Sequence, residues 1–210
     1  MMAVEPNPAP PVTGARGRSD AARNTEAVLL SARAVFADRG ARATIPEIAQ
    51  RAGVGNATVY RAFGSKSGLL TAVGQDLLSW VSQRVAEAVA DAAQHGAAAW
   101  PAFLEDLFER LRTDRMTLSL LCGELIPGLG SAEAEVRAAM GALVSRMQDV
   151  GALRPDVNVE DVTILVTGCA TGLDHARQQD PAQWRRFADH VQRALAPSTP
   201  SRGTTPAPSG

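Results

Sequence analysis

Residues 44–63 read TIPEIAQRAGVGNATVYRAF and predict two short helices joined by a glycine-containing turn. The first helix is expected over about 46–52, because Thr44 and Glu47 have capping-box spacing and Pro46 fits the first helical turn. The second is expected over about 56–62, after a break at residues 53–55, GVG. This arrangement is typical of the helix-turn-helix motif, whose second helix enters the major groove of DNA.

The apolar residues of this stretch are expected to face inward. Ile48, Ala49 and Val59 fall on the inner faces of the two helices, and the small Ala49 lets the helices cross closely. Val54 is expected to fill the angle between them. The second helix then presents outward Gly55, Asn56, Ala57, Thr58 and Arg61.

The rest of the chain has a helical period and no clear strand alternation, which predicts an all-α fold of about nine helices. The first helix carries Val28, Ala32 and Phe36 on one face and is expected to end at Gly40. Beyond the quoted stretch, helices are expected at about 66–95, 100–111, 114–126, 131–151, 158–178 and 181–196.

Two domains between two tails are predicted. Residues 1–18 are rich in proline and glycine, residues 197–210 are rich in proline, serine and glycine, and both segments are expected to be unstructured. Residues 19–65 form the three-helix helix-turn-helix domain, and residues 66–196 form a second helical domain. The long helix that begins near Lys66 is expected to join the two.

Charge is divided unevenly along the 210 residues. Residues 1–66 hold nine basic and five acidic residues, a net charge of +4, whereas the remainder holds 12 basic and 17 acidic residues, a net charge of −5. A basic N-terminal segment suits a polyanionic partner, although chance alone can produce such a difference in charge.

Several classes of protein are excluded by pattern. No apolar run is long enough for a transmembrane helix and no signal-peptide pattern is present, so a cytoplasmic location is expected. The two cysteines cannot form a disulfide framework or a four-thiolate zinc site, and the three histidines share no metal-ligand spacing. No hydrolase, phosphate-loop or redox motif occurs, so we expect neither an enzyme, nor a cofactor, nor a metal site.

The stretch AVFADRG (34–40), TIPEIAQRAGVG (44–55) and ATVYRAFGSKSGLLTAV (57–73) resembles the TetR family of bacterial transcription regulators. The spacing from Thr44 to Leu70 is that of the family without a gap. The segments LRPDVNVEDV (153–162) and WRRF…VQRAL (184–195) are similar to the regulatory domain of the SbtR-like subgroup.

The resemblance implies that several side chains contact DNA phosphates. Tyr60 would bond a phosphate through its hydroxyl, with packing of its ring on the first helix as the alternative. Lys66 would contact a phosphate near the start of the long helix, or else remain a solvated surface lysine. Thr44 would cap its helix and also touch a phosphate, with capping alone as the alternative.

The bases are expected to be read by the second helix of the motif. Asn56 can pair with adenine, and Thr58 can contact a thymine methyl group or hydrogen-bond a base edge. Arg61 can reach a phosphate or a guanine. The alternative for these residues is a polar face without a ligand. A further basic arm, with a solvated tail as its alternative, would consist of Arg16, Arg18 and Arg23.

Two positions depart from the family pattern. The histidine that commonly precedes the motif's phenylalanine is Ala62 here, which removes one usual phosphate contact. Gly68 replaces a better helix former at the start of the long helix, and we expect it to loosen that joint by about 1 kcal/mol.

The second domain is expected to hold a dimer interface and a ligand pocket. By resemblance, residues 158–196 would form a four-helix interface with a second copy, and the helix at 158–178 is apolar on more than one face. The alternative is the central helix of a monomer. Candidate pocket residues, each of which can equally be ordinary core, are Trp80, Trp100, Phe103, Phe108, Met116, Cys122, Met140, Met147 and Cys169.

The resemblance implies a homodimeric repressor that binds a palindromic double-stranded DNA operator and is released by a small-molecule effector. The alternative is a DNA-binding architectural or assembly protein of the same fold without a small-molecule switch.

Overall fold

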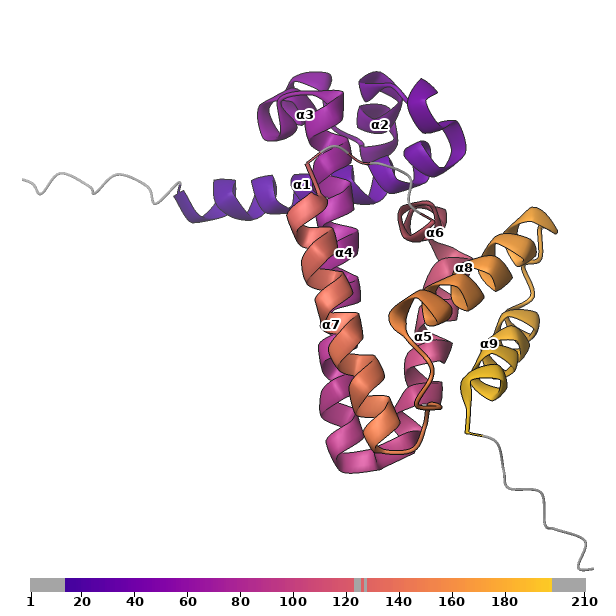
Figure 1. Cartoon of the computed structure of the whole chain (residues 1–210). Helices are drawn as coiled ribbons and strands as arrows, with labels where there is room; N and C mark the ends of the chain where they lie inside the picture. Colours follow the sequence, from indigo (N-terminus) through magenta and orange to yellow (C-terminus); the bar gives the residue numbers. More distant parts are fainter. Residues whose placement is uncertain (1–13, 123–125, 127, 198–210) are drawn as a thin grey trace, which may run out of the picture. The chain divides into compact units, whose positions relative to one another are not determined.

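The structure of the chain is a computed structural model, and it describes residues 14–122, 126 and 128–197. These residues form nine α-helices and no strand, which confirms the predicted all-α class (Figure 1). None of the helices in these ranges is long and apolar enough to cross a membrane. The chain divides into two compact units after Val73, inside one continuous helix.

The first unit consists of three helices and the start of a fourth. They are α1 (Gly14–Arg39), α2 (Ile45–Ala52), α3 (Asn56–Phe63) and the first turns of α4 (Lys66–His95). A short 3-10 turn at Gly40–Arg42 follows α1. α1, α2 and α3 pack on one another, and the predicted inward face of α1 is buried at Val28, Ala32 and Phe36.

α1 begins earlier than expected. Its first residue is Gly14, so residues 14–18, which were expected to belong to an unstructured tail, are helical. The last proline of the tail is Pro11, so no proline interrupts the helix. Ala15, Arg16 and Arg18 favour a helix here, against the poor helix propensity of Gly14 and Gly17. The rest of the expected tail, residues 1–13, and most of the C-terminal tail, 198–210, lie outside the described residues.

The second unit contains the rest of α4 and five further helices. These are α5 (Ala99–Thr113), α6 (Arg115–Leu121), α7 (Gly130–Asp149), α8 (Val159–His175) and α9 (Pro181–Leu195). α5 carries the predicted apolar stripe, which is buried from Trp100 to Leu111 and packs mainly against α9. Phe108 of α5 meets Trp184 of α9 edge to face, with 6.4 Å between ring centroids.

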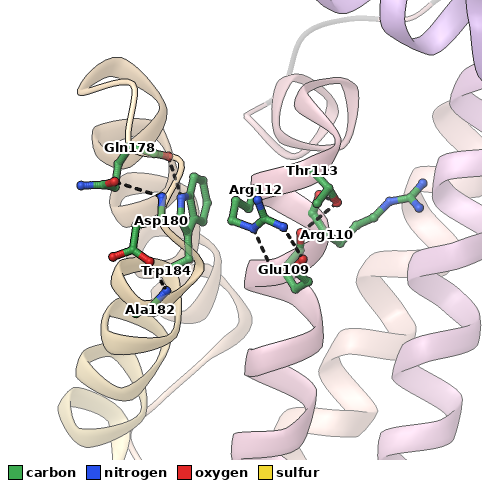
Figure 2. Close-up of polar contacts among 8 residues, drawn as sticks. All are labelled: Glu109, Arg110, Arg112, Thr113, Gln178, Asp180, Ala182 and Trp184. Carbon is green, nitrogen blue, oxygen red and sulfur yellow. Dashed lines mark hydrogen bonds and ion pairs between the residues drawn. The ribbon is translucent and has the colours of Figure 1, made fainter.

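Three hydrogen bonds that involve side chains help to hold the turn between α8 and α9 (Figure 2). The indole N–H of Trp184 donates to the Gln178 carbonyl over 2.9 Å, and the Asp180 N–H donates to the Gln178 side-chain oxygen over 3.1 Å. Asp180 also caps α9, accepting from the Ala182 N–H over 3.0 Å. Trp184 therefore fixes both the packing of α9 on α5 and the path of the turn before it.

α6 is shorter than expected. It begins after the Asp114 cap, as the sequence indicates, but ends at Leu121, well before Ile126. Gly123 follows the C-cap residue Cys122, and Pro127 disfavours a helical conformation for Ile126. Residues 123–125 and 127 lie outside the described residues, whereas Ile126 is buried.

Candidate DNA-binding surface and apolar cavity

The turn between α2 and α3 is set by backbone hydrogen bonds. Gly53 ends α2 in the left-handed region, with φ of 69°, which a glycine adopts without strain. The Gly53 N–H donates to the Gln50 carbonyl (3.2 Å) and the Val54 N–H donates to the Ala49 carbonyl (3.0 Å). These two bonds form a Schellman motif, which turns the chain sharply from α2 into α3.

α2 begins with the capping box that the sequence predicts. The Glu47 N–H donates to the Thr44 hydroxyl oxygen, while the Thr44 N–H and hydroxyl donate to the Glu47 carboxylate over 3.0 and 2.9 Å. These hydrogen bonds from Thr44, together with the charge of Arg39, lower the pKa of Glu47 from its ordinary value. Since the Thr44 hydroxyl hydrogen is already used, its geometry favours the capping role over a phosphate contact.

α3 presents a thin and polar end to solvent. Gly55 precedes the helix without a side-chain cap, and its carbonyl accepts from the N–H groups of Thr58 and Val59. The amides of Asn56 and Ala57 therefore lie at an open helix N-terminus, where anions bind well. Gly55, Asn56 and Ala57 are exposed and Thr58 is half-buried, while Val59 turns into the core.

The polar side chains of α3 are not used elsewhere in the fold. Within the described residues, Asn56, Thr58, Tyr60 and Arg61 have no hydrogen bond or ion pair with another side chain. Tyr60 is 52% exposed, so its side chain is only partly packed against the core. α3 thus holds free donors and acceptors on one short, accessible helix.

The start of α4 lies close to the end of α3 at Phe63. Ser65 caps α4 by accepting from the Gly68 N–H over 3.0 Å, and Lys66 is the first helical residue and half-buried. A Cβ at Gly68 would lie well within 3.0 Å of the Phe63 carbonyl oxygen, closer than Cβ atoms occur in proteins. A better helix former would therefore not fit at this position, and the close approach of the two backbones accounts for the glycine.

The proposed basic arm does not have the form of a free tail. Arg16 and Arg18 lie in the first turns of α1, although their side chains lie outside the described part of the structure. Arg23 is exposed on the same helix and forms an ion pair with Asp20 one turn earlier. Any DNA contact by these residues would come from a helix.

The second unit contains a largely apolar cavity of about 250 Å³ between α4, α5, α6, α7 and α8, which is open to solvent on one side. Of the nine pocket candidates, Phe103 and Met140 line it. Trp100, Phe108, Met116 and Met147 are buried elsewhere in the core.

The three remaining candidates lie away from the cavity lining. Trp80 is half-buried, with the Arg110 guanidinium 4.9 Å from its ring centroid. Cys122 is exposed, with its thiol 3.4 Å from the Thr171 hydroxyl, and Cys169 is half-buried, which raises the pKa of its thiol. In the described ranges no group of three or more His, Cys, Asp or Glu side chains is arranged to hold a metal ion.

Sequence reasoning missed the polar residues of the cavity. Glu133 and Arg137 of α7 and Thr163 and Thr167 of α8 line it, and each pair is separated by four residues. This spacing places both members of a pair on one helical face. A search for polar pairs on otherwise apolar helix faces would have found them.

α8 has a second face that nothing in the described chain covers. Val162, Val166 and Leu173 are buried, but Ile164 is 60% exposed. Gly168 and Gly172 follow Ile164 at intervals of four residues on the same helical face, and both are exposed. A Cβ at either glycine would meet no atom within 4 Å. The predicted apolar character on more than one face is thus present, and this face allows close approach of another backbone.

Comparison with known proteins identifies both units. Residues 28–73 match the model of bacterial regulatory proteins of the tetR family, and residues 95–192 match that of the SbtR-like transcriptional regulator C-terminal domain. No curated protein matches the chain.

Solved structures give the same picture. A TetR transcription regulatory protein from Mycobacterium vanbaalenii is 30% identical, with 86% of this chain and 99% of that chain covered and a TM-score of 0.58. SmeT, the repressor of the Stenotrophomonas maltophilia multidrug efflux pump SmeDEF, is 24% identical over 89% of this chain and 97% of its own, with a TM-score of 0.61. FadR from Bacillus subtilis, solved in complex with stearoyl-CoA, is 15% identical over 81% of this chain and 97% of its own, with a TM-score of 0.59. The last two similarities concern the fold alone.

Proposed function

Because the chain belongs to the TetR family of transcription regulators, we propose that it is a homodimeric repressor of a palindromic operator, released by a small molecule. The observation that carries the proposal is the exposed, uncapped N-terminal end of α3 with its unused polar side chains. A helix of this kind fits the major groove, and the Schellman turn holds it at a fixed angle to α2.

On this proposal the residues of α3 divide into two roles. Asn56 and Thr58 read base edges, and Tyr60, Arg61 and Lys66 contact the backbone phosphates on either side. Thr44 acts mainly as the α2 cap. Phosphate contacts release bound counterions, so affinity should fall steeply as salt rises.

The dimer is proposed to form through α8 and α9, residues 158–196. A single α3 reads too few base pairs for selectivity, and two copies related by a two-fold axis read a palindrome. Support comes from the exposed Ile164 and from Gly168 and Gly172, which leave room for a second helix at short distance.

The effector is proposed to bind in the cavity between α4 and α8. SmeT is a repressor and FadR was solved with an acyl-CoA, so this fold has hosted both repression and ligand binding. The cavity lies against α8, so a ligand there can favour a different separation of the two α3 helices. A hundredfold loss of operator affinity requires only about 2.7 kcal/mol of differential binding.

The experiment that tests this function is selection of genomic DNA fragments by the purified protein at two salt concentrations. We expect an enriched palindrome with half-sites about one turn, roughly 34–36 Å, apart. The variant Asn56→Ala should lose the enrichment, while Gln94→Ala, on the exposed surface of α4, should keep it. Uniform, salt-sensitive retention without an enriched site would instead indicate the architectural alternative, and no retention at either salt would refute DNA binding.

A further inference from the structure

The polar groups that line the cavity include more hydrogen-bond acceptors than donors. Eleven of its fifteen lining residues are apolar, and the four polar ones are Glu133, Arg137, Thr163 and Thr167. Glu133 is half-buried, whereas Arg137 is exposed. Neither has an ion pair or hydrogen bond within the described residues, and the two do not pair with each other. The cavity wall therefore carries a half-buried carboxylate that no group within the described residues pairs with.

The two threonines can act only as acceptors. The Thr163 hydroxyl donates to the Val159 carbonyl over 2.8 Å, and the Thr167 hydroxyl donates to the Thr163 carbonyl over 2.7 Å. Each hydroxyl hydrogen is therefore used within α8, and only the oxygen lone pairs remain for a ligand. Together with the Glu133 carboxylate, the wall presents three acceptors and a single charged donor.

We propose, building on the ligand-released repressor above, that the cavity takes a small amphipathic cation. Its apolar body lies among the leucine, valine and phenylalanine side chains, and its protonated amine lies at Glu133. An amine supplies donors to the carboxylate and to the threonine oxygens, so it satisfies the groups that the wall leaves open.

An anionic ligand fits the same wall less well. Arg137 is its only charged donor, and because that side chain is exposed, water screens a pair formed there. An anion would also meet the Glu133 carboxylate one helical turn away and find no donor on α8.

The volume sets the size of the part of the ligand that is held between the helices. An apolar cavity of about 150 Å³ holds benzene, so 250 Å³ admits a body only somewhat larger. A phenyl ring with a short alkyl chain is of this size. Suitable matched probes are 4-phenylbutylamine, 4-phenylbutan-1-ol and 4-phenylbutanoate, which share one skeleton and differ in the head group.

The experiment is calorimetric titration of the DNA-free, full-length protein with each of the three probes. We expect the amine to bind at least tenfold more tightly than the alcohol, and the carboxylate to bind most weakly, because a hydrogen bond to a charged group adds roughly a factor of ten or more. Equal affinities, tightest binding of the carboxylate, or no binding by any probe would each overturn the proposal.

Variants of α7 make the test specific to Glu133. Glu133→Gln should reduce amine affinity to that of the alcohol, and Arg137→Gln should strengthen amine binding about twofold by removing a like charge. Glu135→Gln, exposed on the same helix outside the cavity, is the matched control and should change nothing. If Glu133→Gln keeps the amine preference, the assignment of the carboxylate is wrong, whether or not the variant melts earlier.

The same probes separate this inference from the proposed repressor function. Amine binding that leaves operator affinity unchanged would support the ligand class and refute ligand-released repression. Release of the operator by the carboxylate, with no binding of the amine, would support ligand-released repression and refute the ligand class.

Discussion

Substitution of Gly68 by alanine tests whether the close approach at the start of α4 is a steric necessity. The higher helix propensity of alanine alone would raise the free energy of unfolding of the variant by about 1 kcal/mol. Against this, the new Cβ would press on the Phe63 carbonyl oxygen, and on the Phe63 carbonyl carbon and the Ser65 hydroxyl at 3.4 Å. Overpacking against backbone costs about 1–3 kcal/mol, so we expect a net loss of up to about 2 kcal/mol.

Gly141→Ala is the matched control for this prediction. Gly141 lies within α7, and a Cβ there would meet no atom within 4 Å. This variant receives the propensity gain without the steric cost, so it should be more stable than the wild type by up to about 1 kcal/mol. Since both variants gain the same propensity, the difference between them measures the cost of the contact with Phe63.

Thermal and urea unfolding followed by circular dichroism measure both variants. A change of 1 kcal/mol shifts Tm by about 2–4 °C in a chain of this length. If the two units unfold separately, Gly68→Ala should lower the transition of the first unit only. An increase in Tm for Gly68→Ala equal to that for Gly141→Ala would refute the reasoning, because the backbone would then have moved aside at no cost.

Three further predictions concern the cap of α2, the DNA surface and the dimer face. Hydrogen bonds from Thr44 lower the folded-state pKa of Glu47 below 4.5, so its stabilisation is present above that pH and is lost as pH falls through the folded pKa. The Tm difference between wild type and Glu47→Gln should therefore be constant near pH 7 and shrink in acid, and a gap that persists in acid would contradict the capping geometry. Tyr60→Phe should weaken operator binding about fivefold in a gel-shift assay without changing Tm, and an altered Tm would mean that the hydroxyl serves the fold. Ile164→Asp should convert the dimer to a monomer in analytical ultracentrifugation, and an unchanged mass would place the interface elsewhere.

Local signals account for most of what the sequence predicted correctly. Thr44 and Glu47 form the capping box that their spacing indicates, because caps act over three or four residues. The helices expected from about 114, 158 and 181 begin there, each after a side-chain cap: Asp114, Asn158 and Asp180. The apolar stripe of α5 is another local signal, because its period depends on one helix alone, and it is buried as expected.

The features that the sequence did not predict depend on groups far apart along the chain or on close backbone contact. The need for glycine at position 68 follows from the path of the chain at Phe63, which residue type alone does not reveal. The cavity draws its lining from five helices, so a large residue such as Trp100 or Met147 gives no sign of whether it faces the cavity or the core. That Glu133 and Thr163 line one cavity becomes visible only when α7 and α8 lie side by side.

The hydrogen bonds around α2 have a consequence for how the molecule folds. The capping box at Thr44 and the Schellman turn at Gly53 close within residues 44–54, and neither needs a partner from elsewhere. Contacts so short in sequence form early, since little chain entropy is lost in closing them. The amides of Thr44, Glu47, Gly53 and Val54 should then be among the first to be protected from hydrogen exchange during refolding. The angle between α2 and α3 would thus be established before most of the second unit has formed its core.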